Sequence, residues 1–561
     1  MERDPTRARI SGFAGTVVEI SVGTTLALRS TALAQREVVG AGAIAALVAV
    51  ALVVLGPPAG DAPAHLYRDL LARDGVLLWD NLWYTGHYPF ASYSLLAYLP
   101  AALVGSVALA VVSVAASAAL FASVALEEWG EVARWPARVF AVCVCAPVFT
   151  GTYTYGLGIT ALLASLWGFQ RGRRWLGILC AGLTLGVSPL AFAFLCLALL
   201  AVGLTYRPPR RTWLVVGLWL TGFVAVQLAI NGLFHAEGQY SFRLQELVWA
   251  LVACGLTAYV ASRSPRGRVI ALVFLLLGIA CAVAFLVDSP LGSNVTRFRA
   301  LVLPLGLLVL GLAGWRPRWL AAICLVLASV YTFSPYVAAA TGLGDTRAAR
   351  AEFWRPALAF LRADPNPNYR VDVVPTFDNW EAYYVPQAGF ALARGWYRQL
   401  DLVRNPALYR ATLTGPDYRE WLRANGVRYV MLPRVELDRV AATAQAELLR
   451  SGQSGLVEVA DLPDWTVYEL TDATPILTGP AAAGLTELGH ERVAGWTRAP
   501  GSYLLRVRHT PYWAVSGDAC VEPTAGGMTR LVMRRAGQFE LQVASPEGLL
   551  RTVFGGRGAA C

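Results

Sequence analysis

The stretch from Gly60 to Pro89 gathers side chains that carry out acid–base chemistry. Its thirty residues hold four Asp, two His, two Arg, two Trp and three Tyr, and they directly follow the first long apolar run of the chain. Asp61 and His65 are four residues apart, so in a helix they share one face. This spacing predicts a general base, Asp61, with His65 orienting or binding a substrate. The alternative is a solvated amphipathic helix on a membrane surface.

Other polar side chains of this loop extend the candidate site. We expect five of them to bind substrate: Arg68, Asp69, Asp80, Tyr84 and His87. The loop also holds Trp79 and Trp83. Aromatic rings among polar groups suit a sugar face or a lipid headgroup, and they equally suit an interfacial aromatic belt.

Three arginines outside this loop are candidates for binding an anion. Arg297 and Arg299 precede a later apolar run, and Arg243 follows an earlier one. The planar guanidinium group recognises phosphate through paired hydrogen bonds. We therefore predict that these arginines bind substrate. The alternative is that they anchor the chain at the membrane interface.

A second group of polar side chains lies in the last third of the chain. The segments FDNWEAYYVPQ and ARGWYRQLD place six of them close in sequence: Asp378, Glu381, Tyr384, Arg394, Trp396 and Arg398. One hypothesis is a lid over the site formed by the first loop. The other is the ordinary surface of an α/β domain.

The elements that must position these residues are mostly apolar. Hydrophobic residues make up 56% of the chain and the mean hydropathy is +0.49, which is typical of an integral membrane protein. Apolar runs of about the length that is needed to cross a bilayer recur up to about residue 340. We predict eleven spans, at about 38–56, 104–126, 137–150, 157–170, 175–187, 190–206, 212–233, 247–261, 269–287, 300–314 and 319–340.

The basic residues predict the orientation of the spans. The net charge is +10 and every basic residue is Arg. The loops rich in Arg, at 171–174, 207–211 and 262–268, all fall on one side of the predicted spans. The positive-inside rule makes that side cytoplasmic, which places the chain in a plasma membrane with its C-terminal region outside the cytoplasm. Because the excess charge lies in these loops, we expect no nucleic-acid partner.

The predicted organisation has four parts. Residues 1–36 form a cytoplasmic or interfacial arm, and residues 37–342 form the membrane domain. Residues 343–472 form an α/β domain, because helix-like segments alternate with strand candidates such as YRVDVVP and VRYVMLP. Residues 473–561 form a β-sandwich, since short alternating strands there are separated by turns.

Two cysteines lie in the region that we expect outside the cytoplasm. They are Cys520 and Cys561, whereas the other seven of the nine cysteines lie in apolar runs. Oxidising conditions outside the cytoplasm let disulfides persist, so we predict a bond between the two. The alternative is a pair of free thiols.

Several common catalytic motifs do not occur in the sequence. There is no Walker A motif, Rossmann glycine pattern, nucleophile elbow, HExxH or paired CxxC. Without Lys there is also no P-loop or Schiff-base lysine. The sequence requires no cofactor, and a divalent metal ion remains an alternative that no motif supports.

The whole pattern resembles a known class of membrane enzymes. An acidic first external loop, about eleven spans and an external C-terminal region resemble the GT-C superfamily of glycosyltransferases. More narrowly, GDAPAHLYR and WYTGHYPFASYSLLAYLP resemble the 6-pyruvoyl-tetrahydropterin-synthase-related membrane domain, a label that implies no pterin chemistry. The segments WLRANGVRYVML, WTVYEL and TPYWAVSGD resemble the extracytoplasmic part of YfhO-type membrane proteins.

The resemblance implies transfer of a sugar from a polyprenyl-phosphate donor to an envelope glycan or lipid acceptor, next to the lipid bilayer. The catalytic acidic residue of the family matches Asp61. Many members carry a second acidic residue, and since Ala62 follows Asp61, this role would fall to Asp69 or Asp80. Two other classes remain: a non-catalytic envelope-assembly protein that binds lipid-linked glycan, and a lipid or glycan transporter. Span interiors nearly free of charge count against the transporter.

Overall fold

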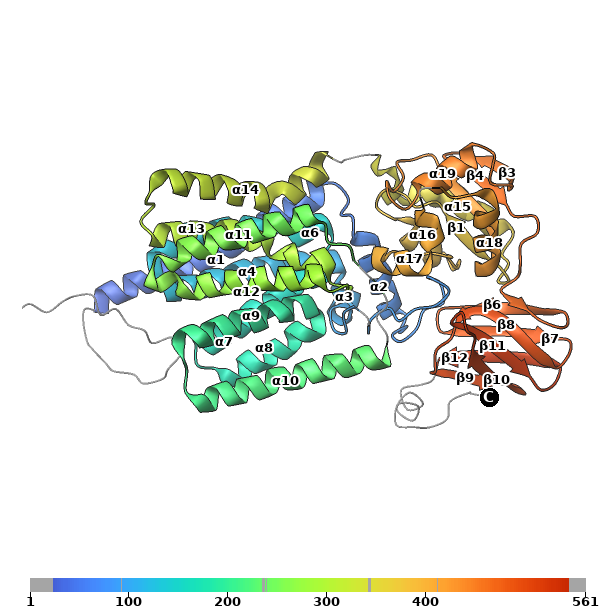
Figure 1. Cartoon of the computed structure of the whole chain (residues 1–561), viewed down its shortest axis with the longest axis horizontal. Helices are drawn as coiled ribbons and strands as arrows, with labels where there is room; N and C mark the ends of the chain where they lie inside the picture. The colour runs from blue at the N-terminus through green and yellow to red at the C-terminus, as the bar shows by residue number, and fades with distance from the viewer. Residues whose placement is uncertain are drawn as a thin grey trace, which may run out of the picture. The chain divides into compact units, whose positions relative to one another are not determined.

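The chain folds into two compact units, which Figure 1 draws in a computed structural model. The structure describes residues 24–91, 93–234, 238, 240–341, 345–410, 412–543 and 561, so most of the expected arm 1–36 lies outside the described residues. The helical unit comprises Met1–Ala59, Tyr93–Gly232 and Gln239–Gly342. The mixed unit comprises Gly60–Ser92, Leu233–Gly238 and Leu343–Cys561.

The helical unit is built from long apolar helices. Its α-helices are α1 (Thr24–Leu55), α3 (Tyr98–Val104), α4 (Ser106–Trp129), α5 (Arg134–Cys143), α6 (Ala146–Thr150), α7 (Tyr153–Gln170), α8 (Arg174–Val187), α9 (Pro189–Tyr206), α10 (Arg210–Leu233), α11 (Leu244–Ser262), α12 (Arg268–Leu286), α13 (Val302–Leu312) and α14 (Arg318–Thr341). Three 3-10 helices join them: η1 (Gly130–Ala133), η2 (Pro265–Gly267) and η3 (Gly292–Leu301).

These helices confirm a polytopic α-helical membrane protein. Among the described residues, seven helical stretches are long and apolar enough to cross a membrane, and two shorter apolar helices accompany them. Each of the eleven predicted segments lies on one or two of the helices listed above. The number of spans stays a prediction. Large apolar side chains such as Leu218 and Val326 are exposed on the helix surfaces, as a surface that faces lipid requires.

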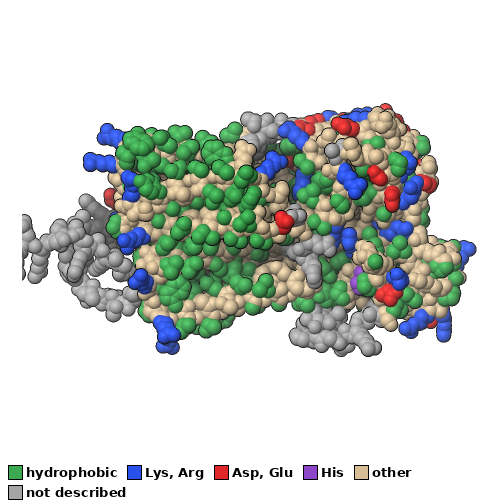
Figure 2. All heavy atoms as spheres, in the orientation of Figure 1, with side chains coloured by type: hydrophobic (Ala, Val, Ile, Leu, Met, Phe, Trp, Pro, Cys, Tyr) green, Lys and Arg blue, Asp and Glu red, His purple; other side chains and the backbone are tan. Residues whose placement is uncertain are grey.

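The loops rich in Arg gather at one end of the helical unit. Arg171, after α7, forms an ion pair with Glu127 of α4 at 2.8 Å. The indole of Trp129 donates to the backbone oxygen of Arg266, between α11 and α12, at 2.9 Å. Figure 2 shows blue side chains at the left end of the green helical surface. Helix ends that are far apart in sequence therefore share the side that we predicted to be rich in Arg.

The mixed unit contains a four-stranded sheet covered by helices. The strand order is β1-β2-β4-β3, and β1 is parallel to β2 while the other pairs are antiparallel. The strands are β1 (Arg370–Val373), β2 (Val427–Pro433), β3 (Val457–Leu462) and β4 (Trp465–Glu469). The helices are α2 (Ala62–Arg73), α15 (Ala351–Ala363), α16 (Glu381–Gln387), α17 (Arg398–Arg404), α18 (Gly415–Asn425) and α19 (Thr443–Arg450), with η4 (Thr346–Ala349) and η5 (Pro406–Tyr409).

Two antiparallel sheets of four strands each follow along the chain, with orders β10-β11-β8-β5 and β6-β7-β12-β9. Their inward side chains, such as Tyr503, Leu531 and Leu541, form one shared core. The strands are β5 (Leu477–Thr478), β6 (Ala483–Leu488), β7 (Arg492–Thr497), β8 (Gly501–Arg508), β9 (Trp513–Ser516), β10 (Ala519–Pro523), β11 (Met528–Met533) and β12 (Gly537–Val543). The expected C-terminal strands are thus confirmed, and the two sheets with one core make a sandwich.

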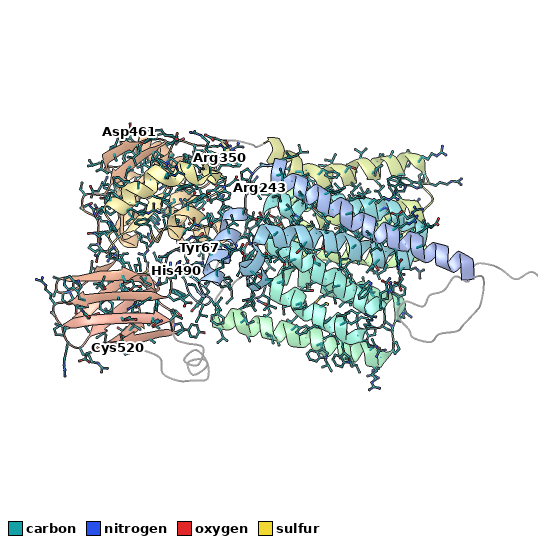
Figure 3. All side chains as sticks on the ribbon, turned by 180° about the vertical axis from the view of Figure 1, so that it is seen from behind. Tyr67, Arg243, Arg350, Asp461, His490 and Cys520 are labelled. Carbon is teal, nitrogen blue, oxygen red and sulfur yellow. A yellow bond between two sulfur atoms is a disulfide. The ribbon has the colours of Figure 1, made fainter. Side chains whose placement is uncertain are left out.

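The predicted disulfide is also confirmed. Cys520 of β10 is bonded to Cys561, and the two Cα atoms are 5.1 Å apart. Cys520 is labelled in Figure 3. The seven other cysteines are free thiols in the helical unit.

The first polar loop, which the predicted boundaries assign to the membrane domain, groups with the C-terminal part of the chain. The backbone N–H of Leu392 donates to the oxygen of Leu82 at 2.8 Å, which adds the loop to the sheet edge beside β1. On its other side the loop reaches the sandwich, where Asn81 N–H donates to the oxygen of His490 at 2.9 Å. The loop therefore joins the α/β part to the sandwich.

Candidate functional site

Two carboxylates from distant parts of the sequence meet where the first loop begins. Asp61 immediately precedes α2, and Asp378 lies shortly before α16, which packs against α2. Both side chains are half-buried. A β-carbon on Gly60 would lie 3.3 Å from Oδ1 of Asp378, so a glycine at this position lets the two segments approach. We call Asp61 and Asp378 the carboxylate pair.

The environment of the pair raises the pKa of Asp378 to about 7. The largest cause is burial, and the charge of Asp61 comes next, followed by those of Glu436 and Asp438. A neighbouring negative charge disfavours ionisation of a carboxyl group. Asp378 is therefore largely protonated below neutral pH.

The parallel strands explain why these acidic residues converge. Asp378 follows β1, and Glu436 and Asp438 follow β2. The carboxyl ends of parallel strands lie at the same edge of a sheet, which is where α/β proteins commonly bind ligands. Two backbone hydrogen bonds hold the loops together, from Phe377 N–H to the oxygen of Glu436 and from Asp438 N–H to the oxygen of Pro375, both at 2.9 Å.

The other candidates on α2 are buried inside the mixed unit. His65 is 2% exposed, Arg68 1% and Asp69 3%. Arg68 donates from Nε to the oxygen of Pro89 at 2.8 Å, and its guanidinium lies 4.3 Å from the centre of the Tyr397 ring. His65 therefore lies within α2, whereas Asp61 is the residue that precedes this helix, and the two side chains differ in exposure.

Asp80 is the centre of a buried polar cluster. Its carboxylate accepts from Tyr67 Oη at 3.0 Å, from the N–H of Leu82 at 3.1 Å and from His490 Nδ1 at 2.9 Å. Burial raises the pKa of Asp80, but the hydrogen bond and charge of His490 outweigh it, so the pKa is lowered overall. Tyr67 and His490 lie side by side in Figure 3. The cluster links the loop to the turn between β6 and β7.

His87 and Tyr84 belong to the same buried region. Burial lowers the pKa of His87 to about 4, so it is neutral at pH 7 although Asp80 Oδ2 is only 3.7 Å from its Nδ1. Its ring stacks on Trp83, with ring centres 5.5 Å apart. Tyr84 Oη donates to the oxygen of Tyr397 at 3.1 Å and accepts from the Tyr397 N–H at 2.7 Å.

The two tryptophans of the loop are core residues. Trp79 is 2% exposed and belongs to the core of the sandwich, and Trp83 is fully buried. The indole N–H of Trp83 donates to the oxygen of Ala382 in α16 at 3.0 Å. These positions fit neither a sugar face nor an interfacial belt.

The three candidate arginines lie in the helical unit, at separate places. Arg243, labelled in Figure 3, is exposed before α11. Arg297 and Arg299 both lie on η3, but the guanidinium of Arg297 lies 5.8 Å from the ring centre of Tyr155 in α7. That of Arg299 lies 5.4 Å from the ring centre of Tyr331 in α14. These two side chains therefore contact different helices.

An apolar cavity adjoins Arg299. It lies between α11, α13 and α14, and about 520 Å³ of space there is not filled by protein atoms, part of it open to the surroundings. Tyr331 lines the cavity and is 7% exposed, and its hydroxyl group has no hydrogen-bond partner among the residues that the structure describes. The cavity thus combines apolar walls with one buried polar atom next to a guanidinium group.

The second group of polar residues, like the first loop, contains both packing residues and residues that line a cavity. Tyr384 donates to the oxygen of Ala349 at 2.8 Å and stacks on Trp354, so it has a packing role. Four others line a cavity near the carboxylate pair: Glu381, Arg394, Trp396 and Arg398.

No group of three or more His, Cys, Asp or Glu side chains within the described ranges has an arrangement that could hold a metal ion.

Sequence reasoning did not find the partners of Asp61 and Asp80. Asp378 and His490 are 317 and 410 residues further along the chain, and a local pattern carries no signal for such pairings. One signal was present for Asp378, because it follows a strand candidate, YRVDVVP, in an α/β pattern. Residues that follow the carboxyl end of a strand are frequent ligand contacts.

The comparisons with known proteins give similarities to solved structures alone. No family model and no curated protein matches the chain. Among solved structures, the chain is similar to the crystal structure of ArnT from Cupriavidus metallidurans bound to undecaprenyl phosphate. The TM-score is 0.34 and the identity 13%, over 82% of this chain and 100% of that chain. A TM-score this low does not establish a shared fold, so the case for a function rests on the residues themselves.

Proposed function

We propose that the protein is a membrane glycosyltransferase of the GT-C type. It transfers a sugar from a polyprenyl-phosphate donor to an envelope glycan or lipid acceptor on the extracytoplasmic face of the plasma membrane. The observation that carries the proposal is the carboxylate pair, in which one half-buried carboxyl group has a pKa near 7 beside a second one. Such pairs are suited to accepting a proton from a hydroxyl group near neutral pH.

The orientation is supported by two independent features. The Arg-rich loops share one end of the helical unit, which the positive-inside rule assigns to the cytoplasm. The disulfide between Cys520 and Cys561 fits an oxidising compartment for the mixed unit.

In the proposed reaction, Asp61 acts as the general base. The acceptor hydroxyl oxygen forms a bond to the anomeric carbon of the donor sugar, and its proton passes to the Asp61 carboxylate. The bond between the anomeric carbon and the lipid-phosphate oxygen breaks, and its electron pair stays on the phosphate. Asp378, largely neutral up to about pH 7, keeps the local negative charge low while the phosphate leaves.

The helical unit, taken by itself, offers a place for the hydrocarbon chain of a lipid-linked donor. The apolar cavity between α11, α13 and α14 suits a hydrocarbon chain, because its walls are almost entirely aliphatic. Arg299 and the hydroxyl group of Tyr331 lie at this cavity, and each offers hydrogen-bond donors to an anion. Arg297 and Arg243 are secondary candidates for the same headgroup. His65, Arg68, Asp69, Asp80, Tyr84 and His87 hold the loop that positions Asp61.

A transfer assay tests the proposal. Membranes that contain the protein are incubated with a panel of radiolabelled polyprenyl-phosphate sugars, and label in envelope glycan or lipid is counted. We expect one donor to be used and Asp61→Asn to lower turnover by roughly 10²–10⁴-fold, because the amide cannot accept the proton. Asp74→Asn is the matched control, since Asp74 lies in the same loop and is exposed. Near-normal turnover by Asp61→Asn would overturn the proposed mechanism.

A further inference from the structure

Helix α10 has little contact with the other helices of its unit. Of the seven long apolar stretches among the described residues, α10 alone contains no buried residue, whereas 17–50% of the residues are buried in the other six. No hydrogen bond or ion pair between side chains joins α10 to α8 within the described ranges. The sides of α10 are therefore open to whatever surrounds the unit.

Aromatic contacts show how α10 runs beside α8. Trp175, at the start of α8, lies against Trp219, with ring centres 6.2 Å apart. Further along α8, a β-carbon on Gly182 would lie 3.0 Å from the ring of Phe223. The two contacts occur in the same order along both helices. The helices therefore run in the same direction and begin at the same end of the helical unit (Figure 1).

That end is strongly basic. Five exposed arginines lie at or just before the starts of α8 and α10, and we call them the arginine cluster: Arg173, Arg174, Arg207, Arg210 and Arg211. None of them forms an ion pair with a residue that the structure describes, whereas their neighbour Arg171 is paired with Glu127. Like charges that are close together repel one another, so a bound anion would relieve the repulsion.

Exposed apolar side chains continue from the arginine cluster along both helices. On α8 they are Trp175, Leu179 and Leu183, which are spaced four residues apart. On α10 they are Leu214 and Leu218, with the same spacing. Side chains four residues apart lie on one face of a helix. Each helix thus presents an apolar stripe that begins next to its own arginines.

This combination of charge and apolar surface defines the chemistry of a ligand. Guanidinium groups donate paired hydrogen bonds to phosphate oxygens. The apolar stripes suit hydrocarbon chains, which a soluble phosphate lacks. A zwitterionic headgroup carries its own ammonium group, which the unpaired arginines repel. The surface therefore favours a lipid whose headgroup has a net negative charge.

We propose that the arginine cluster and the two apolar stripes bind an anionic phospholipid. The arginines hold its phosphate group, and its acyl chains cover the stripes of α8 and α10. This site is independent of the proposed reaction, because it involves neither the carboxylate pair nor the apolar cavity between α11, α13 and α14.

Native mass spectrometry of the full chain in detergent tests the site. Phosphatidylglycerol, which is anionic, and phosphatidylcholine, which is zwitterionic, are titrated in turn, and the retained lipid is counted. We expect phosphatidylglycerol to bind about tenfold more tightly, and the double variant Arg210→Gln, Arg211→Gln to lose most of this preference. The double variant Arg316→Gln, Arg318→Gln is the matched control. It removes two exposed arginines at the start of α14 and should keep the preference.

Photo-crosslinking in membranes locates the bound lipid. A phosphatidylglycerol with a photoreactive headgroup is activated, and the labelled peptides are identified by mass spectrometry. We expect the label in residues 174–187 and 210–233, and its loss in the variant of Arg210 and Arg211.

Three outcomes would overturn the proposal. The first is equal binding of the two lipids by the unaltered chain. The second is an equal loss of preference in both double variants, or label that is as strong in α14 as in α8 and α10. The third is displacement of the lipid by glycerol phosphate, because the arginines would then hold a soluble anion. Asp61→Asn should bind phosphatidylglycerol normally, so failure of the proposed reaction leaves this test intact.

Discussion

Asp61 and Asp80 belong to the same polar loop, yet their surroundings differ in kind. Asp80 is fully buried and accepts hydrogen bonds from Tyr67, Leu82 and His490. Asp61 is half-buried at the start of α2, beside the carboxyl group of Asp378. One carboxylate is surrounded by donors that stabilise its charge, and the other faces a second acid. The comparison separates a carboxylate that holds the fold together from one that can exchange a proton.

A loop that is dense in charged residues can therefore contain both core residues and residues of a functional site. Its second half, with Trp79, Asp80 and Trp83, is part of the core between the α/β sheet and the sandwich. Its first residues lie beside Asp378, which follows β1 at the carboxyl edge of the sheet. We therefore expect substitutions in the second half to affect stability and substitutions at the first residues to affect turnover.

The largest effect on stability should follow removal of the buried carboxylate. Asp80→Ala leaves His490 and Tyr67 without their partner, and breaking a buried ion pair typically costs about 3–5 kcal/mol. We expect the melting temperature of the mixed unit to fall. It is measured from the tryptophan fluorescence of the full chain in detergent. Asp74→Ala, at an exposed position of the same loop, is the control. Equal melting curves for the two variants would contradict a structural role for Asp80.

The next effect should come from the disulfide. Loss of the bond between Cys520 and Cys561 is expected to cost about 2–4 kcal/mol. Cys520→Ser, Cys561→Ser and the double variant should be destabilised alike, because each breaks the same bond. Cys324→Ser, which removes a free thiol of α14, should change little. Alkylation of both thiols in native protein, or additive costs for the two single variants, would refute the bond.

The smallest effect concerns the pH dependence of transfer. The pKa of Asp378 is raised to about 7, so its neutral form prevails below pH 7 and its carboxylate above it. A second negative charge next to Asp61 opposes departure of the phosphate, so turnover should fall by up to about tenfold between pH 6.5 and 8.5. Asp378→Asn stays neutral and should lack this fall. A fall of equal size in the variant would assign it to another group.

Part of this structure could be predicted from the sequence. The eleven apolar runs lie on helices because bilayer-length segments without charge have a strong local signature. The alternation of apolar and polar residues predicted the C-terminal strands. The position of the two cysteines outside the apolar runs predicted the Cys520–Cys561 bond. The role of the loop did not, because Asp80 meets His490 and Asp61 meets Asp378 only through the tertiary fold. The density of charged residues predicted a functional role for the whole loop. The burial of the individual side chains distinguishes the residues that stabilise the fold from those that can take part in a reaction.

We propose that Asp61 carries out the chemistry while Asp80 supports the fold. The most direct test measures turnover per folded molecule for Asp61→Asn and Asp80→Asn in the same membrane preparation, with the folded fraction taken from resistance to limited proteolysis. We expect Asp61→Asn to be fully folded and to lose roughly 10²–10⁴-fold in turnover. Asp80→Asn should have less folded protein and near-normal turnover per folded molecule. Normal turnover by folded Asp61→Asn, or a specific loss of turnover in well-folded Asp80→Asn, would contradict the account.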